Sequence, residues 1–437
     1  AESLYAIEHD TMDTTFRSMY QGLYAYLSAR KERRDLLLSQ RPPRFDKSLD
    51  SMIFCSEDDF TRVALKAKAA QDYFLLIGPP GTGKTSCALK KMVETFHADK
   101  DAQILLLSYT NRAVDEICKS LASIAPAVDF IRVGSELSCD EAYRGHLIEN
   151  ELSSCNRRSE VYERIRNCRI IVGTVAAISG KPELFRLKHF DVAIIDEATQ
   201  ILEPQLLGIL CARGEDEKDA IDKFVLIGDH KQLPAVVQQN AEQAAIYDES
   251  LLSIGLSNLK DSLFERLYRN CTAACSSSAI HRSYDMLCRQ GRMHPEVALF
   301  ANRAFYGGRL IPVGLPHQIE DSDTICRLAF YPSVPEKAGA SAKINYSEAR
   351  IVADLAVRIY EDHQTDFDES RTLGIITPYR SQIALIKKEI ESLGIPALNR
   401  ILVDTVERFQ GSERDVIIYS FCVNYPYQLK FLSNLTE

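Results

Sequence analysis

The stretch Gly78-Pro79-Pro80-Gly81-Thr82-Gly83-Lys84-Thr85 decides the fold of this chain. It follows the apolar run Tyr73 to Ile77 and opens a helix-like segment from Ser86 to Phe96. A strand, a glycine-rich loop and a helix in that order form a phosphate site, because backbone N–H groups at the helix start point at the anion. The sequence therefore predicts a nucleotide site in an α/β fold.

Each residue type in this loop has a chemical purpose. The glycines permit positive φ angles and close approach of the backbone to the β-phosphate. Lys84 would neutralise β and γ oxygens, and the Thr85 hydroxyl would ligate Mg²⁺. The alternative is a chance glycine-rich turn. The predicted nucleotide-binding residues are Gly78, Pro79, Pro80, Gly81, Thr82, Gly83, Lys84, Thr85 and Ser86.

The composition indicates a multidomain protein. A chain of 437 residues with 46% hydrophobic and 26% charged residues can bury two or three cores. No apolar run reaches the roughly 18 residues of a membrane span. The twelve cysteines are scattered through segments that read as core, which favours reduced thiols and an intracellular, cytoplasmic or nuclear, location over secretion. The net charge of −9 argues against nonspecific coating of nucleic acid but permits a local basic track.

The N-terminal segment, residues 1–50, is predicted to be helical. Apolar residues recur at helical spacing from about Thr11 to Gln40, and the pattern ends near Pro42-Pro43. The basic run 30–34 on this helix is interpreted as a solvated face, with direct contact to nucleic acid as the alternative.

From Tyr73 onward, short apolar segments alternate with helical patterns, which is typical of a parallel sheet flanked by helices. The expected strands are 74–77, 104–108, 170–173, 192–195 and 224–228, and a second series lies near 373–377, 401–404 and 416–421. The second series begins after the serine-rich stretch 275–278. We therefore expect tandem domains at 51–272 and 273–437, with a helical insertion at 135–167.

Polar residues follow two of the expected strands. Asp196 and Glu197 come directly after the strand that ends at Ile195, where one carboxylate can hold Mg²⁺ and the other can orient and deprotonate water. Gln232 follows the next strand, and its amide can donate to a γ-phosphate while accepting from water. An acidic strand exit and a polar turn are the ordinary alternatives.

Segments 78–85, 196–200 and 228–234, in this order, resemble the nucleotide motifs of superfamily I helicases. Residues 108–115 and Gly173-Thr174 resemble motifs that hold the nucleic-acid backbone. In the second domain, 290–295 is similar to an arginine-finger motif, 376–382 to a strand that contacts nucleic acid, and 403–413 to the coupling motif.

Within this superfamily, the details resemble one branch. Asp-Glu-Ala-Thr-Gln at 196–200 and Arg-Met-His-Pro at 292–295 look like the branch with the nonsense-mediated-decay RNA helicase, senataxin and the replication helicase-nuclease. Asp72-Tyr73 and Ser108-Tyr109-Thr110 favour the helicase part of the last of these. The resemblance covers roughly Arg44 to Phe421. It implies two RecA-like P-loop domains, ATP and Mg²⁺, and 5′-to-3′ movement on single strands.

The resemblance also implies roles for single residues. ATP would be held and hydrolysed by Lys84, Glu197, Gln232 and Arg292, with Mg²⁺ on Thr85 and Asp196 and with Glu413 near the nucleotide from the facing domain. The strand would contact Thr110, Asn111, Thr174, Pro378, Tyr379 and Thr405. Such hydroxyls, amides and one aromatic ring contact backbone and bases without reading sequence. A packed core aromatic is the alternative for Tyr379.

The chain departs from the branch in three places. Gly291 stands where the branch usually has an adenine-stacking tyrosine, and residues 58–61 contain no glutamine to read the base. The chain also ends at Glu437 before a last motif with a second catalytic arginine, so we expect an incomplete second domain. Because an arginine finger contributes about 10³ to 10⁵ in rate, the chain as written should bind ATP better than it hydrolyses it.

The favoured hypothesis is an ATPase and helicase, expected to be a monomer, that moves on single-stranded DNA in preference to RNA and binds no membrane. A nucleotide-gated module that clamps nucleic acid or protein without unwinding is the alternative. A P-loop enzyme acting on proteins or metabolites would leave the second-domain motifs unexplained.

Overall fold

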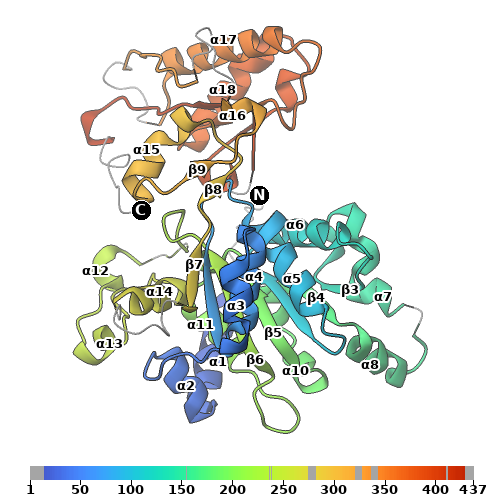
Figure 1. Ribbon diagram of the computed structural model, residues 1–437. Coiled ribbons are helices and arrows are strands. Elements are labelled where there is room, and N and C mark those ends of the chain that lie inside the picture. The colour runs from blue at the N-terminus through green and yellow to red at the C-terminus, as the bar shows by residue number, and fades with distance from the viewer. Residues whose placement is uncertain are drawn as a thin grey trace, which may run out of the picture. The chain divides into compact units, whose positions relative to one another are not determined.

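The computed structural model describes residues 14–153, 155–235, 237, 239–273, 282–319, 327–335, 343–409 and 412–428 (Figure 1). Contacts divide the chain into two compact units, 1–322 and 323–437. The serine-rich stretch 275–278, Gln410-Gly411 of the coupling motif and residues 429–437 lie outside the described residues.

The first unit is built on a seven-stranded sheet, and the α/β prediction is confirmed. Every strand pairing in this sheet is parallel. In spatial order the strands are β3 (Phe130–Val133), β4 (Ile170–Thr174), β2 (Ile104–Ser108), β5 (Phe190–Ile195), β6 (Ile221–Gly228), β1 (Tyr73–Ile77) and β7 (Tyr284–Met286). The carboxyl ends of these strands therefore meet at one edge of the sheet, where ligands bind in such folds.

Both faces of this sheet are covered, which explains the near-continuous apolar runs of strands such as β1 and β2. On one face, Phe74 and Leu76 belong to a cluster shared with α4 (Asp59–Ala69), α5 (Lys90–His97) and α6 (Asn111–Ala122). On the other face, Leu75 and Ile77 belong to a cluster shared with α9 (Val175–Ser179), α10 (Glu183–Leu187), α11 (Glu203–Leu210) and α14 (Leu263–Ala273). Neighbouring side chains of one strand thus enter different cores.

Two strands of this sheet were not predicted, and neither was the separate pair β8 (Arg289–Gln290) and β9 (Ile311–Pro312). In β3 the buried Arg132 interrupts the apolar pattern, and this arginine pairs with Asp115 of α6. In β7 only three residues pair, and Asp285 lies at its centre. Because β7 pairs with β1, the compact unit that holds the glycine-rich loop extends past the expected boundary at residue 272. The domain limits stay a prediction.

The second unit contains a parallel three-stranded sheet in the order β11 (Leu402–Asp404), β10 (Leu373–Ile376), β12 (Val416–Tyr419). Helices α17 (Tyr346–Asp362) and α18 (Arg380–Ser392) pack with these strands in one core that includes Leu373, Ile375 and Ile386. The helical pattern after Ser347 and the second strand series are therefore present as predicted.

Shorter elements complete the described residues. The expected insertion at 135–167 consists of short helical segments: η3 (Glu136–Ser138), η4 (Glu141–His146), α7 (Ile148–Glu151) and α8 (Arg158–Asn167). The others are η1 (Lys47–Leu49), α3 (Asp50–Cys55), η2 (Lys84–Leu89), η5 (Ala198–Gln200), α12 (Ala241–Ala244), α13 (Glu249–Ser253), β8 (Arg289–Gln290), α15 (Pro295–Phe305), β9 (Ile311–Pro312), α16 (Pro316–Ile319), η7 (Leu398–Arg400), α19 (Val406–Phe409) and η8 (Pro426–Gln428). Among the described residues, no helix is both long and apolar enough to cross a membrane.

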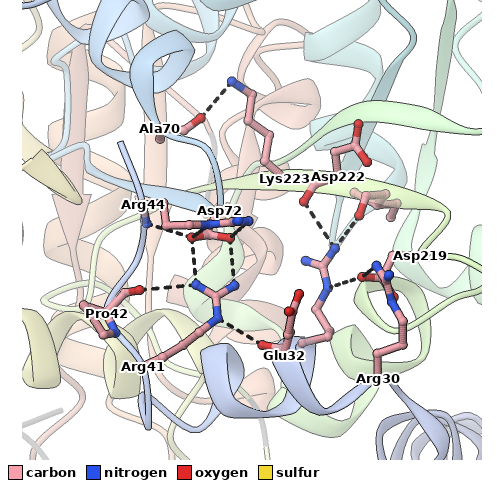
Figure 2. Close-up of polar contacts among 12 residues, drawn as sticks. Arg30, Glu32, Arg41, Pro42, Arg44, Ala70, Asp72, Asp219, Asp222 and Lys223 are labelled. Carbon is pink, nitrogen blue, oxygen red and sulfur yellow. Dashed lines mark hydrogen bonds and ion pairs between the residues drawn. The ribbon is translucent and has the colours of Figure 1, made fainter. Parts of the chain in front are cut away.

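The N-terminal segment forms two helices, α1 (Thr14–Ser28) and α2 (Lys31–Leu37), rather than one continuous helix. The break falls at Arg30, whose backbone is extended at φ −60° and ψ 146°. Arg30 Nη2 lies 2.6 Å from Asp219 Oδ2 (Figure 2). Arg33 is buried and donates to the carbonyl of Ile221. The interpretation of the basic run as a solvated face is therefore wrong for Arg33, whereas Arg30 remains exposed while it pairs with Asp219.

A second set of contacts, the Asp72 anchor, joins the N-terminal segment to the amino end of β1 (Figure 2). Asp72 is buried, and its carboxylate accepts from Arg41 Nη1 at 2.9 Å and from Arg44 Nη2 at 2.9 Å. The backbone N–H of Arg44 donates to the same carboxylate at 2.7 Å. Burial alone would raise the pKa of Asp72, but Arg41 and Arg44 outweigh it and hold this pKa below its usual value.

Candidate nucleotide and nucleic-acid site

The glycine-rich loop has the backbone that its sequence predicts. Gly81 and Gly83 both have φ +73°, a conformation that favours glycine. The Thr82 hydroxyl donates to the carbonyl of Pro79 at 2.7 Å and closes the turn. A Cβ at Gly78 would lie 2.7 Å from Cβ of Lys84, so glycine lets the lysine side chain cross the loop. The loop leads into a wide helical turn, η2 (Lys84–Leu89).

The predicted lysine, threonine and carboxylates meet at the ends of β1 and β5. Lys84 Nζ lies 2.9 Å from Glu197 Oε1, and the Thr85 hydroxyl donates to Asp196 Oδ2 at 2.5 Å. Burial would lower the pKa of Lys84, but Glu197 and Asp196 outweigh it and raise this pKa. Burial and the Glu197 charge raise the pKa of Asp196. The Lys84 ammonium and two carboxylates thus share one largely buried corner.

Glu197 has an unusual backbone. Its φ of 53° and ψ of 36° place it in the left-handed region, which non-glycine residues adopt at a cost. Its side chain accepts from Gln200 Nε2 at 3.0 Å, while its backbone N–H donates to Asp196 Oδ1 at 2.9 Å. The Gln200 bond holds one oxygen of the Glu197 carboxylate while the other oxygen faces Lys84. Sequence reasoning had assigned no role to Gln200.

Gln232 lies at the end of β6, as expected, and is held by a carboxylate. Its Nε2 donates to Asp229 Oδ2 at 2.7 Å. The same oxygen accepts from the hydroxyl of Tyr306 at 2.7 Å. Gly78 N–H donates to the carbonyl of Gly228 at 2.9 Å, so the end of β6 is joined directly to the glycine-rich loop.

Arg292 lies beside the glycine-rich loop within the first unit. Gly291 N–H donates to the carbonyl of Gly81 at 2.8 Å. A Cβ at Gly81 would lie 2.5 Å from Cβ of Arg292. The turn is fixed by Gln290 Oε1, which accepts from the backbone N–H groups of Arg292 at 3.0 Å and Met293 at 2.8 Å.

Two of the predicted nucleic-acid residues cap helices at neighbouring strand ends. The Thr110 hydroxyl accepts from Ala113 N–H at 3.2 Å at the start of α6. The Thr174 hydroxyl accepts from Ala177 N–H at 3.1 Å at the start of α9. Strands β2 and β4 are paired at Ser108 and Thr174, so the two caps lie at the same edge of the sheet. Asn111 is the first residue of α6.

The other predicted nucleic-acid residues, Pro378, Tyr379 and Thr405, belong to the second unit. They follow β10 and β11, which are paired at Ile376 and Asp404. The Tyr379 hydroxyl accepts from Gln428 Nε2 at 3.4 Å. A cavity of about 570 Å³ at these strand ends is lined by Arg380, Ile383, Asp404, Thr405, Glu407 and Arg408. Glu413 precedes β12 in this same unit.

Besides Gln200, Asp229 and Tyr306 are site residues that sequence reasoning missed. Asp229 could have been noticed because it precedes Gln232 in the polar turn after β6. Tyr306 carries no local signal, since its partner lies 77 positions earlier in the chain.

Comparison with known proteins identifies related sequences. Two family models, each described as an AAA domain, match residues 259–435 and residues 56–160 with 149–240. The chain is 29% identical over 454 residues to the DNA replication ATP-dependent helicase/nuclease JHS1 of Arabidopsis thaliana, covering 96% of this chain and 30% of that protein.

Further relatives are also named as DNA helicases. The chain is 29% identical over 446 residues to the DNA replication ATP-dependent helicase/nuclease DNA2 of Xenopus laevis, covering 90% of this chain and 38% of that protein. It is 24% identical over 460 residues to the DNA polymerase alpha-associated DNA helicase A of Saccharomyces cerevisiae, covering 88% of this chain and 63% of that protein. The chain therefore spans less than two thirds of the length of each. On its motifs, fold and matches, the chain belongs to the superfamily I helicases, in the branch that contains the replication helicase-nuclease.

Proposed function

We propose that this chain is the ATP-driven motor of a helicase that moves 5′ to 3′ on single-stranded nucleic acid, with DNA favoured over RNA. One observation carries the proposal: Lys84 and Thr85 of the glycine-rich loop pair with Glu197 and Asp196 at the end of β5. This is the charge arrangement that ATP hydrolysis needs, because a lysine must meet phosphate while a neighbouring carboxylate meets water.

The proposed chemistry begins with an exchange of partners. ATP would draw the ammonium of Lys84 from Glu197 to the β and γ oxygens, which releases the Glu197 carboxylate. Glu197 would then orient the attacking water and accept its proton. Gln232 would bind the γ-phosphate, and Arg292 would stabilise the charge that develops on it.

Mg²⁺ fits the residues at this corner. Thr85 and Asp196 offer a hydroxyl and a carboxylate oxygen within 2.5 Å of each other, and hard divalent cations prefer oxygen ligands. When bound, Mg²⁺ would neutralise charge on the phosphates. Thr85 and Asp196 would hold it, directly or through water.

We further propose that nucleic acid runs along the strand ends of both domains. Thr110, Asn111 and Thr174 would contact the backbone on the first domain, and Pro378, Tyr379 and Thr405 would do so on the second. ATP would be hydrolysed where the two domains meet, with Glu413 contributed by the second. Closure on ATP and reopening after hydrolysis would advance the grip on the strand.

ATP turnover with and without single-stranded DNA or RNA tests the proposal. In the full-length protein we expect either strand to stimulate turnover, more strongly for DNA. Lys84→Ala should abolish nucleotide binding, whereas Glu197→Gln should retain binding and lose turnover. The matched controls are Lys100→Ala and Glu149→Gln, which change exposed residues of the same unit and should leave turnover unchanged.

The outcomes separate the alternatives. Nucleotide binding without turnover at any strand concentration would contradict the motor and support the nucleotide-gated module, for which Gly291 in place of a stacking tyrosine is the favouring feature. Turnover that strands leave unchanged would support an NTPase with another substrate. Duplexes with a single-stranded 5′ or 3′ tail test direction, because the proposal expects unwinding from the 5′ tail.

A further inference from the structure

The partly buried Gln232 and the buried Asp229 and Tyr306 form a hydrogen-bonded cluster at the end of β6. Asp229 is 1% exposed and Tyr306 is 5% exposed. The Asp229 Oδ2 atom accepts from both Gln232 Nε2 and the Tyr306 hydroxyl, each at 2.7 Å. The other oxygen, Oδ1, accepts from Lys231 N–H at 3.0 Å. Two side-chain donors therefore share one carboxylate oxygen.

The two donors come from different parts of the first unit. Gln232 follows β6, whereas Tyr306 directly follows α15. Helix α15 begins at Pro295, three residues after Arg292, and its eleven residues span about 16 Å. One end of α15 is thus linked to the backbone beside Gly81, and the other end is linked to Asp229.

The Tyr306 hydroxyl is suited to a constant role as donor. Burial raises its pKa, and the neighbouring Asp229 charge raises it further. The hydroxyl therefore keeps its proton at neutral pH and well above it. Asp229 also lies close enough to act on the charge of Lys84.

We propose that Tyr306 is a positioning residue for γ-phosphate recognition, holding Asp229 so that Gln232 can leave this carboxylate for the nucleotide. The inference rests on the proposed function, because it assumes that Gln232 contacts the γ-phosphate. When the Gln232 amide turns to the phosphate, Asp229 Oδ2 keeps the Tyr306 donor. Without the hydroxyl, the same movement would leave the buried oxygen without either of these donors, which is unfavourable. Gln232 would then remain on Asp229.

The same bond connects nucleotide state to α15. When Gln232 leaves, Asp229 Oδ2 loses one of these two donors and keeps the Tyr306 hydroxyl. A charged acceptor with fewer partners binds the remaining donor more strongly. The end of α15 is held more tightly when the γ-phosphate is present. Tyr306 therefore acts through Asp229 and touches no reacting atom.

The test compares Tyr306→Phe, Gln232→Ala and the double variant in the full-length protein. The first readout is discrimination, the ratio of the dissociation constants for ADP and a non-hydrolysable ATP analogue, which needs no turnover. We expect Tyr306→Phe to reduce this ratio about tenfold, as one bond to a buried carboxylate warrants. In the Gln232→Ala background, Tyr306→Phe should change it no further. Tyr162→Phe, on α8 of the insertion, is the matched control.

The second readout is strand-stimulated turnover, where Tyr306→Phe should lower kcat and leave KM for ATP nearly unchanged. A purely structural role would instead lower kcat by the same factor with and without Gln232, and that result overturns the inference. Wild-type discrimination that survives Tyr306→Phe also overturns it while leaving the proposed function intact. A wild-type protein that binds both nucleotides equally would contradict γ-phosphate recognition itself, and with it both proposals.

Discussion

The Nζ atom of Lys84 lies 2.9 Å from Oε1 of Glu197, so the lysine of the glycine-rich loop is paired with a carboxylate. Phosphate must compete with this carboxylate for the ammonium. The pair therefore holds Lys84 in place before ATP binds and opposes ATP binding at the same time.

Glu197→Gln is expected to separate binding from turnover. The amide keeps the shape of the side chain but removes the charge that competes with phosphate, so ATP affinity should rise a few-fold. Turnover should fall by about 10² to 10⁴, the usual contribution of a general base. Titration with a fluorescent nucleotide and single-turnover hydrolysis measure the two effects. If turnover stays at the wild-type level, Glu197 is not the base.

Asp72→Asn is expected to destabilise the first unit by about 2 kcal/mol, because the neutral amide loses the charge-assisted hydrogen bonds that the buried carboxylate accepts from Arg41 and Arg44. Thermal unfolding of the variant and of Asp101→Asn, which changes an exposed aspartate, measures the difference. An equal effect of both substitutions would show that the anchor adds nothing.

The same anchor predicts a pH dependence. The pKa of Asp72 is lowered in the folded protein, so its contribution is complete above the unfolded value of about 4 and is lost as pH falls toward the folded value. The stability difference between wild type and Asp72→Asn should therefore be constant above about pH 5 and shrink below about pH 4. A difference that grows on acidification would contradict the assignment.

His230 should affect stability in a pH window above that of Asp72. Burial, and then the charge of Lys231, lower the pKa of His230 to about 4, while Asp229 opposes this and Arg269 and Arg309 add to it. A histidine with a lowered folded pKa stabilises above its unfolded value of about 6.5 and loses that contribution as pH falls toward 4. The free energy of unfolding of the wild type should fall by up to about 3 kcal/mol as the pH falls across this window. His230→Phe, which keeps an aromatic ring against Tyr268, should lose less stability across the same window.

His189 is the control of opposite sign. Its hydrogen bond to Asp222 raises the pKa of His189, so this contribution is present below about 6.5 and is lost as pH rises through the folded value. His189→Phe should therefore lower the free energy of unfolding on the acidic side of the same pH window. Parallel shifts in the two histidine variants would exclude both assignments.

Much of the nucleotide site could be predicted because its information is local. The positive φ of Gly81 and Gly83 follows from residue type, and parallel strands must bring Lys84 and Glu197 to one edge of the sheet. Motif order then identified the family. These features need no knowledge of how distant helices pack.

The rest depends on partners chosen by packing. Nothing in the sequence indicates that Asp72 pairs with Arg41 and Arg44. Arg132 alone predicts the end of a strand, and only its pairing with Asp115 explains why it is buried within one. Tyr306 reaches Asp229 because α15 happens to end there. Long-range polar pairs of this kind carry no periodic signal, so hydrophobic patterning cannot reveal them.

Gly81→Ala should impair turnover through a contact rather than through strain alone. Its φ of +73° strains any L-residue, and an added Cβ would lie 2.5 Å from Cβ of Arg292, so the turn that carries Arg292 must move. Gly308→Ala isolates the strain, because Gly308 has φ +74° and a Cβ there meets nothing within 4 Å. Both variants should lose about 1 kcal/mol of stability, whereas strand-stimulated kcat should fall about tenfold or more in Gly81→Ala and stay near wild type in Gly308→Ala. Equal kcat in the two variants would mean that the position of Arg292 against the glycine-rich loop does not matter for hydrolysis.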